Sequence, residues 1–227
     1  MSQDQIFATG EGDRWFERNC TALSNAERLS DDPPLYLLEL CGIVPSQVLE
    51  VGASNGYRLD TLRLRHGCRV VAVEPSLTAI EDGQRRYPAI QFLCGLASAI
   101  PIEQSGQFDL VIIHFVLHWV DRSMLLSSVA EIDRMVADGG HLLIGDFHPA
   151  TPERVAYHHL PNDEIWTYKQ DYAEVFIASG IYNRVAALSF DHAGHRVAAD
   201  VAPENRIQVA LLRKSLHQGY PIRTLDR

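Results

Sequence analysis

The stretch VLEVGASNGYRLDTL, from Val48 to Leu62, decides the fold. Its apolar run contains Glu50, and Gly52 and Gly56 follow four residues apart before a segment with helical spacing. Glycine lets a backbone adopt positive φ values or approach a ligand closely, so a glycine-rich turn between a strand and a helix is typical of nucleotide binding. The turn therefore predicts a dinucleotide, a phosphate or a related cofactor as its ligand.

The residues inside the turn exclude two of these ligands. A dinucleotide turn has the pattern G-x-G-x-x-G, whose third glycine allows close packing of the helix on the strand. Counted from Gly52, the second and third positions hold Ser54 and Tyr57, so the pattern fails twice. A phosphate-binding loop is excluded because no Gly-Lys-Ser/Thr follows. What remains is acid-x-Gly-x-Gly-x-Gly with serine in place of the middle glycine.

Short apolar runs alternate with helical segments through the middle of the chain. The runs QVLEVG, RVVAVE, IQFLC, FDLVIIHF and HLLIGDF predict strands, and helices are expected at 57–66, 77–87 and 121–137. Such alternation is typical of a parallel sheet covered on both faces. Upstream, residues 12–41 predict two helices, the second capped and started by Asp31-Asp32-Pro33-Pro34.

The end of the chain breaks this alternation. After a helix near 172–179, the runs 182–191 and 205–213 are joined by too few residues for a crossover helix, so they should form an antiparallel hairpin at the sheet edge. The predicted fold is α/β, a doubly wound and mostly parallel seven-stranded sheet. Its last strand is antiparallel, helices cover both faces, and two helices precede the first strand. A single domain is expected over residues 1–227.

Composition and charge limit the partners. A chain of 227 residues that is 46% hydrophobic suits one domain, and a formal net charge of -9 disfavours nucleic acid. The arginines between Arg58 and Arg69 alternate with leucines at helical spacing, which indicates the solvated face of a helix. No basic leader with an apolar core and no run of about 18 apolar residues is present, so a cytoplasmic protein without a membrane partner is expected.

The remaining turn pattern resembles motif I of the class I S-adenosylmethionine-dependent methyltransferases, and the resemblance extends from about Val48 to Leu212. It implies S-adenosylmethionine as the cofactor and S-adenosylhomocysteine as its product. It also implies that Glu50 supports the turn. The residues expected around the amino-acid part of the cofactor are Gly52, Ala53, Ser54, Asn55 and Gly56.

Two further stretches resemble the family. Glu74 ends the second predicted strand, 18 residues beyond Gly56, where the family holds the ribose diol, and Pro75 beside it is expected to contact the cofactor. The alternative is that Glu74 only caps the next helix. In CGLASAIP, Leu96 stands where many members carry an acid for the adenine, so only backbone contacts from Leu96 and Ala97 are expected, with weaker binding.

The stretch FDLVIIHFVLHWVDR, 108–122, is similar to the family's fourth strand and the loop after it. Members that methylate amide or base nitrogens carry Asn/Asp-Pro-Pro-aromatic there, whereas this chain has His114-Phe115-Val116-Leu117. DNA-adenine and glutamine methylation are therefore not expected. By resemblance, His114 and His118 help to wall the cofactor site.

Methyl transfer requires few catalytic side chains, because displacement at a sulfonium is accelerated mainly by alignment in a dry site. A hydroxyl acceptor would use a general base, and histidine suits neutral pH. His114 and His148 follow predicted strands at the carboxyl edge of the sheet, where open α/β sheets bind ligands, so they are the candidate bases. A structural hydrogen-bonding role is the alternative for each.

The segment 148–172 is too long for an ordinary strand-to-helix connection, which predicts a substrate-side loop insertion. Its rings suit a polar, ring-bearing small molecule; the candidate substrate contacts are Tyr157, His158, His159 and Tyr168. A solvated loop is the alternative. A metal at His148, His158, His159, Asp163 and Glu164 lacks a recognised ligand spacing, so no metal is expected.

Residues 1–45 are expected to form a helical lid, with Trp15 facing the substrate; packing of Trp15 on the sheet edge is the alternative. The stretch GEGDRWFERN, 10–19, resembles small methyltransferases of bacterial sugar and surface-polysaccharide pathways. The predicted function is methyl transfer to a small molecule, at oxygen, by a monomer or homodimer. N- or C-methylation and a non-catalytic binding module are the alternatives.

Overall fold

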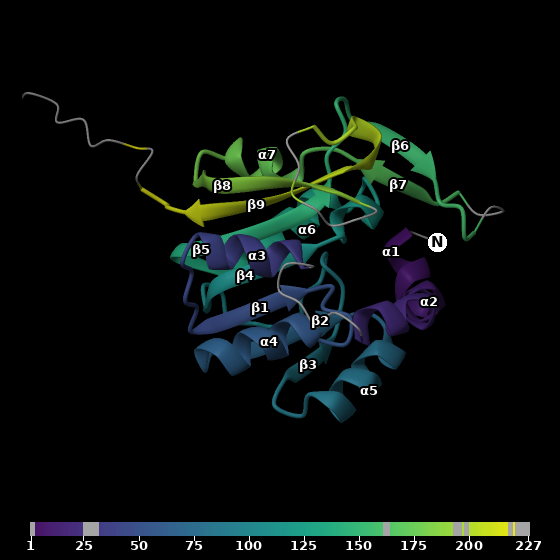
Figure 1. Ribbon diagram of the computed structural model, residues 1–227, viewed down its shortest axis with the longest axis horizontal. Helices are drawn as coiled ribbons and strands as arrows, with labels where there is room; N and C mark the ends of the chain where they lie inside the picture. The colour runs from purple at the N-terminus through teal and green to yellow at the C-terminus, as the bar shows by residue number, and fades with distance from the viewer. Residues whose placement is uncertain are drawn as a thin grey trace, which may run out of the picture.

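The computed structural model describes residues 3–24, 32–160, 164–192, 197, 200–217 and 220. A seven-stranded sheet forms its centre, in the order β3-β2-β1-β4-β5-β9-β8 (Figure 1). The strands are β1 (Gln47–Val51), β2 (Arg69–Glu74), β3 (Gln91–Cys94), β4 (Phe108–His114), β5 (Val136–Phe147), β8 (Tyr182–Asp191) and β9 (Arg206–Lys214). Only β9 runs against its neighbours in this sheet, so the predicted fold with an antiparallel last strand is confirmed.

Helices cover both faces of the sheet, and an apolar cluster lies under each layer. On one face pack α3 (Pro33–Leu40) and α4 (Tyr57–His66), and on the other α6 (Leu125–Met135) and α7 (Tyr172–Ile177). The helix α5 (Leu77–Arg86) packs beside β2 and β3. Leu59 of α4 and Ile132 of α6 are fully buried, and burial of such a side chain stabilises the fold by about 1.5–3 kcal/mol.

The helix boundaries follow the predicted capping residues. The Asp32 carboxylate accepts the Leu35 N–H at 2.9 Å, and Pro33 occupies the first turn of α3. The predicted helix at 121–137 is shorter, because the chain is already extended at Val136, where β5 begins. Residues 25–31, which include Asp31 of the predicted cap, lie outside the described residues.

The N-terminal segment begins its helix earlier than predicted. It consists of α1 (Gln3–Ile6), the π-helical turn η1 (Phe7–Glu11) and α2 (Gly12–Ser24). Gly10 adopts a φ of +155° inside this segment and bends it. Because the bend changes the helix direction, the apolar periodicity of residues before Gly12 does not continue that of α2.

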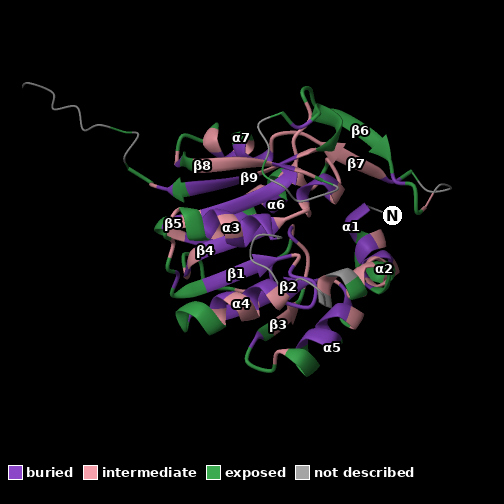
Figure 2. Cartoon of the chain, in the orientation of Figure 1, coloured by how far each residue is buried: buried purple, intermediate pink, exposed green. Residues whose placement is uncertain are grey.

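The segment 148–172, which was predicted as a loop insertion, contains a second, two-stranded sheet. In it β6 (Glu153–Ala156) pairs antiparallel with β7 (Trp166–Lys169). The β6 side chains are all exposed, and the hairpin stands beside the N-terminal helices at one side of the molecule (Figures 1 and 2). With so little apolar alternation in β6, only the pairing with β7 defines it as a strand.

Candidate functional site

A cavity of about 640 Å³ opens at the carboxyl ends of the parallel strands. Ligand sites in open α/β sheets form at this edge, and the volume lies within the range of about 300–1,000 Å³ that small-molecule pockets occupy. Its walls come from the turns after β1, β2, β3 and β4, from the N-terminal helices and from the β6–β7 hairpin.

The glycine turn after β1 is held in a conformation that few side chains allow. Gly52 has a φ of +74°, and a Cβ atom there would lie 2.2 Å from Cγ2 of Val116. Ser54 also has a positive φ, 51°, although it is not glycine. Its buried Oγ has no hydrogen-bond partner among the described residues, and Ser54 lines the cavity. The turn thus presents an unsatisfied polar atom to a ligand.

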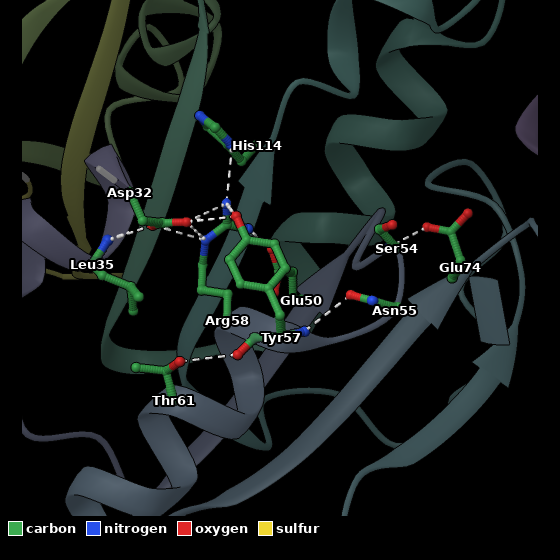
Figure 3. A network of polar contacts seen from close by, with 10 residues as sticks. All are labelled: Asp32, Leu35, Glu50, Ser54, Asn55, Tyr57, Arg58, Thr61, Glu74 and His114. Atoms are coloured by element: carbon green, nitrogen blue, oxygen red, sulfur yellow. Dashed lines mark hydrogen bonds and ion pairs between the residues drawn. The ribbon is translucent and has the colours of Figure 1, made fainter. Parts of the chain in front are cut away.

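Glu74 ties the end of β2 to this turn. Its Oε2 accepts the Ser54 N–H at 2.8 Å, and its Oε1 accepts the Ser76 N–H at 2.9 Å (the former is drawn in Figure 3). Burial raises the Glu74 pKa to about 7, although the two N–H groups lower it. The cap of α5 is Ser76, whose Oγ accepts the Ala79 N–H, so Glu74 is not the helix cap.

Other predicted cofactor residues divide into two groups. Pro75, Leu96 and Ala97 line the cavity, as do Gly52, Ala53, Ser54, Glu74, His114 and His118. Glu50, Asn55 and Gly56 are not among the described lining residues. The Asn55 side chain turns toward α5 and donates to Asp82 at 3.0 Å, so its role in the turn is structural.

Arg58 is the centre of a buried charge network that the sequence did not reveal. Its guanidinium donates to Asp32 at 3.0 Å and contacts Glu50 closely (Figure 3). Burial raises the Glu50 pKa to about 7, while Arg58 lowers it. Arg58 is 6% exposed, so its predicted place on a solvated helix face is wrong. Helical spacing predicted the position of α4, but it did not predict which face of this helix packs against the glycine turn.

The first candidate base, His114, carries its proton on the side away from Arg58. Its Nδ1 lies 3.3 Å from the Arg58 guanidinium. Arginine only donates hydrogen bonds, so Nδ1 accepts and the imidazole proton is on Nε2. This tautomer makes Nε2 of His114 a donor rather than a base.

The second candidate base, His148, lies away from the cavity. It is not among the described lining residues, and its Nε2 lies 3.3 Å from Asp171 Oδ2, at the start of α7. His148 directly follows β5, but its side chain points toward the start of α7 and not into the cavity. The geometry does not favour His148 as a base.

Most of the predicted substrate contacts do meet at the cavity. Trp15, Tyr157, His158 and His159 line it. Tyr168 is not among the described lining residues, because its ring packs 4.3 Å beneath the Arg122 guanidinium. Strand alternation explains the difference: neighbouring side chains of β7 point to opposite faces, and Thr167 and Lys169 face the cavity instead.

The N-terminal helices and the hairpin are joined above the cavity. Tyr157 donates its hydroxyl to Glu11 at 2.8 Å, and Arg18 donates to both. Phe7 stacks on Trp119 with ring centroids 4.9 Å apart. These contacts link segments that lie far apart in sequence and close one wall of the cavity.

Among the described residues, no group of three or more histidines, cysteines or acids could hold a metal ion. Asp163, one residue of the alternative metal site, lies outside the described part of the chain.

Comparison with known sequences supports the methyltransferase resemblance. Residues 49–144 match the family model described as a methyltransferase domain. A demethylmenaquinone methyltransferase of Renibacterium salmoninarum is 36% identical over 124 residues, which cover 53% of this chain and 51% of that protein. The chain spans about half the length of the curated relatives it matches.

Solved structures share the fold. The 1,6-didemethyltoxoflavin-N1-methyltransferase of Burkholderia thailandensis, solved with bound 1,6-didemethyltoxoflavin and S-adenosylhomocysteine, has a TM-score of 0.68 at 16% identity, covering 95% of this chain and 91% of its own. The N-methyltransferase NodS of Bradyrhizobium japonicum, with S-adenosylhomocysteine, has a TM-score of 0.60 at 19% identity, covering 89% and 97%.

The matches confirm the resemblance, seen in the glycine turn, to the class I S-adenosylmethionine-dependent methyltransferases. In the part of the chain that the structure describes, no helix combines the length and apolar character needed to cross a membrane. The expected cytoplasmic location, the oligomeric state and the lack of a nucleic-acid partner stay predictions.

Proposed function

We propose that this protein transfers a methyl group from S-adenosylmethionine to a small molecule that carries a planar ring. The proposal rests on one observation, the distribution of side chains along the cavity. Since β2 and β3 lie on one side of β1 while β4 and β5 lie on the other, Glu74 and Leu96 belong to one end and Phe147 to the opposite end. A cofactor end and an acceptor end thus share one cavity.

The cofactor end has groups suited to each part of S-adenosylmethionine. Glu74 keeps acceptor capacity on both carboxylate oxygens beyond its two N–H partners, so it can hold the ribose diol. The turn at Gly52 and Ser54 brings backbone close to the amino-acid part, and Leu96 and Ala97 border the adenine. When bound, the cofactor supplies a methyl group on a positively charged sulfur.

The acceptor end is built from rings with a single lysine. Phe115 and Phe147 lie with ring centroids 5.2 Å apart, and His192 lies 5.1 Å from Phe147. Lys169 stands 5.0 Å from the Phe147 ring centroid. All four line the cavity. Aromatic walls favour a flat ring, which stacks or packs edge-on against them.

The names of relatives support a ring acceptor more than a sugar. One relative is named for demethylmenaquinone and one solved structure for 1,6-didemethyltoxoflavin, both ring compounds. No name among these supports the sugar or surface-polysaccharide pathway suggested by residues 10–19. Oxygen is the proposed acceptor atom. A ring hydroxyl that loses its proton to a polar side chain of the site becomes an oxygen anion, which can attack the methyl group.

The N-terminal helices and the hairpin are proposed to act together as the lid. They wall the site with Trp15 from α2 and Tyr157 after β6. Closure over bound ligands excludes water, which favours displacement at a sulfonium. The contact between Glu11 and Tyr157 holds the two parts of the lid together.

A methyl-transfer screen tests the proposal. The protein is incubated with methyl-labelled S-adenosylmethionine and a panel of naphthohydroquinones, catechols and hydroxylated nitrogen heterocycles, with nucleotide sugars as the contrasting set. Labelled ring products and release of S-adenosylhomocysteine are expected. Turnover of nucleotide sugars alone would contradict the ring acceptor. Glu74→Ala should abolish most of the signal, whereas Glu39→Ala, at an exposed carboxylate, is the matched control.

A further inference from the structure

His118 and Asp146 form a buried pair beneath the acceptor end. His118 belongs to the short turn η3 (Leu117–Trp119) after β4, and Asp146 lies near the end of β5. They are 1% and 5% exposed, and Nδ1 of His118 lies 2.9 Å from Oδ1 of Asp146. Burial of two such polar side chains among rings is costly unless they satisfy each other.

The carboxylate of Asp146 is fixed by the backbone around it. Its Oδ2 accepts the His118 N–H at 3.2 Å, and its Oδ1 accepts the Phe147 N–H at 2.8 Å. The bond from the His118 backbone N–H to Asp146 already connects η3 to β5. The contact between the His118 imidazole and Asp146 is therefore not required for this connection. The carboxylate lies beside Nδ1, which has no hydrogen bond among the described residues, and its negative charge favours the imidazole proton on Nδ1 and the lone pair on Nε2.

The two cavity histidines therefore hold opposite tautomers. His114 faces a cation through Nδ1 and presents a donor, whereas His118 faces a carboxylate through Nδ1 and presents an acceptor. Both line the cavity. Of the two, only His118 has a carboxylate beside Nδ1, as a general base of the histidine–acid type does.

Phe147 brings this base close to a cation. The His118 ring lies 5.1 Å from the Phe147 ring centroid, and Lys169 lies 5.0 Å from it. Lys169 also pairs with Glu153 at 3.3 Å, but it lines the cavity and its side chain is 18% exposed. A proton acceptor and a positive charge thus both lie beside the ring of Phe147.

We propose that His118, held in position by Asp146, accepts the proton of a hydroxyl on a planar ring, and that Lys169 stabilises the resulting oxygen anion. This inference rests on the proposed ring acceptor and names its reacting group. The O–H proton moves to Nε2 of His118. The oxygen lone pair forms the bond to the methyl carbon while the carbon–sulfur bond breaks, its electron pair remaining on sulfur. His118 then releases the proton to solvent.

A chromogenic phenol tests the proton transfer without turnover. 4-Nitrophenol has one ring hydroxyl and turns yellow when it ionises. It is titrated with pH in the presence of protein saturated with S-adenosylhomocysteine. The bound phenol should ionise about one pH unit lower than the free phenol. In His118→Gln most of this shift should be lost, and in Lys169→Met it should be reduced, while His66→Gln, at an exposed histidine, keeps it in full.

The outcomes separate this inference from the proposed function. If S-adenosylhomocysteine binds but the phenol does not bind, or ionises as it does in solution, the assignment of His118 and Lys169 is overturned. The same holds if His118→Gln shows the native shift. Failure of every ring compound in the methyl-transfer screen instead overturns the ring acceptor. Asp146→Asn, a positioning variant, should reduce the shift while S-adenosylhomocysteine affinity stays unchanged; if His118→Gln does not fold, Lys169→Met decides.

Discussion

The carboxylate of Glu74 accepts the backbone N–H of Ser54 at 2.8 Å, so the end of β2 is bonded directly to the glycine turn after β1. This bond places an acid of raised pKa at the rim of the turn, where a ribose diol would lie. The turn and its acid, which are 20 residues apart in sequence, form one binding element.

Removal of the Glu74 carboxylate should weaken cofactor binding. Glu74→Ala is expected to lower the affinity for S-adenosylhomocysteine at least about tenfold, or about 1.4 kcal/mol, because both ribose hydroxyls lose their acceptor. Isothermal titration calorimetry gives the comparison, with Glu39→Ala as the control at an exposed carboxylate. An affinity for S-adenosylhomocysteine that does not change in Glu74→Ala removes the ribose assignment.

The pKa of Glu74 should make cofactor affinity depend on pH. Burial raises this pKa to about 7, so much of the carboxyl is protonated at pH 6 and little at pH 8. Because the ionised carboxylate is the form proposed to accept both ribose hydroxyls, the affinity for S-adenosylhomocysteine should rise between pH 6 and pH 8. Calorimetry at intermediate pH values measures the rise, and Glu74→Gln should flatten it. A flat native profile contradicts the role of the ionised form.

The same raised pKa should affect stability with the opposite sign. The folded-state pKa of Glu74, about 7, exceeds the ordinary value of 4.5. Its stabilising contribution is therefore full below about pH 4.5 and is lost as pH rises through about 7. Urea unfolding between pH 5 and pH 8 should show a free energy of unfolding that falls with pH. Glu74→Gln should make the slope shallower; Glu50, whose pKa is raised likewise, leaves a residual slope.

Replacing Ser54 by glycine should relieve strain in the turn. Ser54 has a φ of 51°, a region that costs a side chain about 1–3 kcal/mol, while glycine adopts it freely. After the extra chain entropy of glycine, Ser54→Gly is expected to raise the melting temperature by about 2–4 °C. Calorimetric affinity for S-adenosylhomocysteine then tests the buried Oγ: a loss assigns it to the cofactor. A lower melting temperature would argue against strain.

Arg58 should be a stability residue of the site. Arg58→Met leaves Asp32 and Glu50 as buried, uncompensated carboxylates, which should cost about 3–5 kcal/mol in the free energy of unfolding. Arg63→Met on the same helix breaks only a more exposed pair with Asp60 and should cost about 1 kcal/mol or less. Chemical denaturation of both variants makes the comparison. Equal losses would mean that the buried network is not specially stabilising.

Sequence patterns predicted the structural features that depend on residues close together in the chain. The turn pattern indicated the strand, the tight backbone and the helix after it, and the run 182–191 matches β8 residue for residue. Apolar alternation suffices where each strand is bounded by turn residues, because local geometry and burial agree there.

The features that the sequence did not predict depend on contacts between residues far apart in the chain. Arg58 is buried because Asp32 and Glu50 approach it from α3 and β1, and no local pattern records that meeting. In the same way, β6 is a strand only through its pairing with β7, and His118 differs from His148 in that it lines the cavity. Candidate bases could be named because they follow strand ends. Their tautomers could be assigned only from the side chains that contact them in the structure.

A crystal structure of the protein with bound S-adenosylhomocysteine would show directly which residues hold each part of the cofactor. We expect both ribose hydroxyls to donate to Glu74, the adenine to lie beside Leu96 and Ala97, and the sulfur to face the surface formed by Phe115 and His118. A ribose held away from Glu74, or a sulfur turned from that aromatic surface toward solvent, would contradict this expectation.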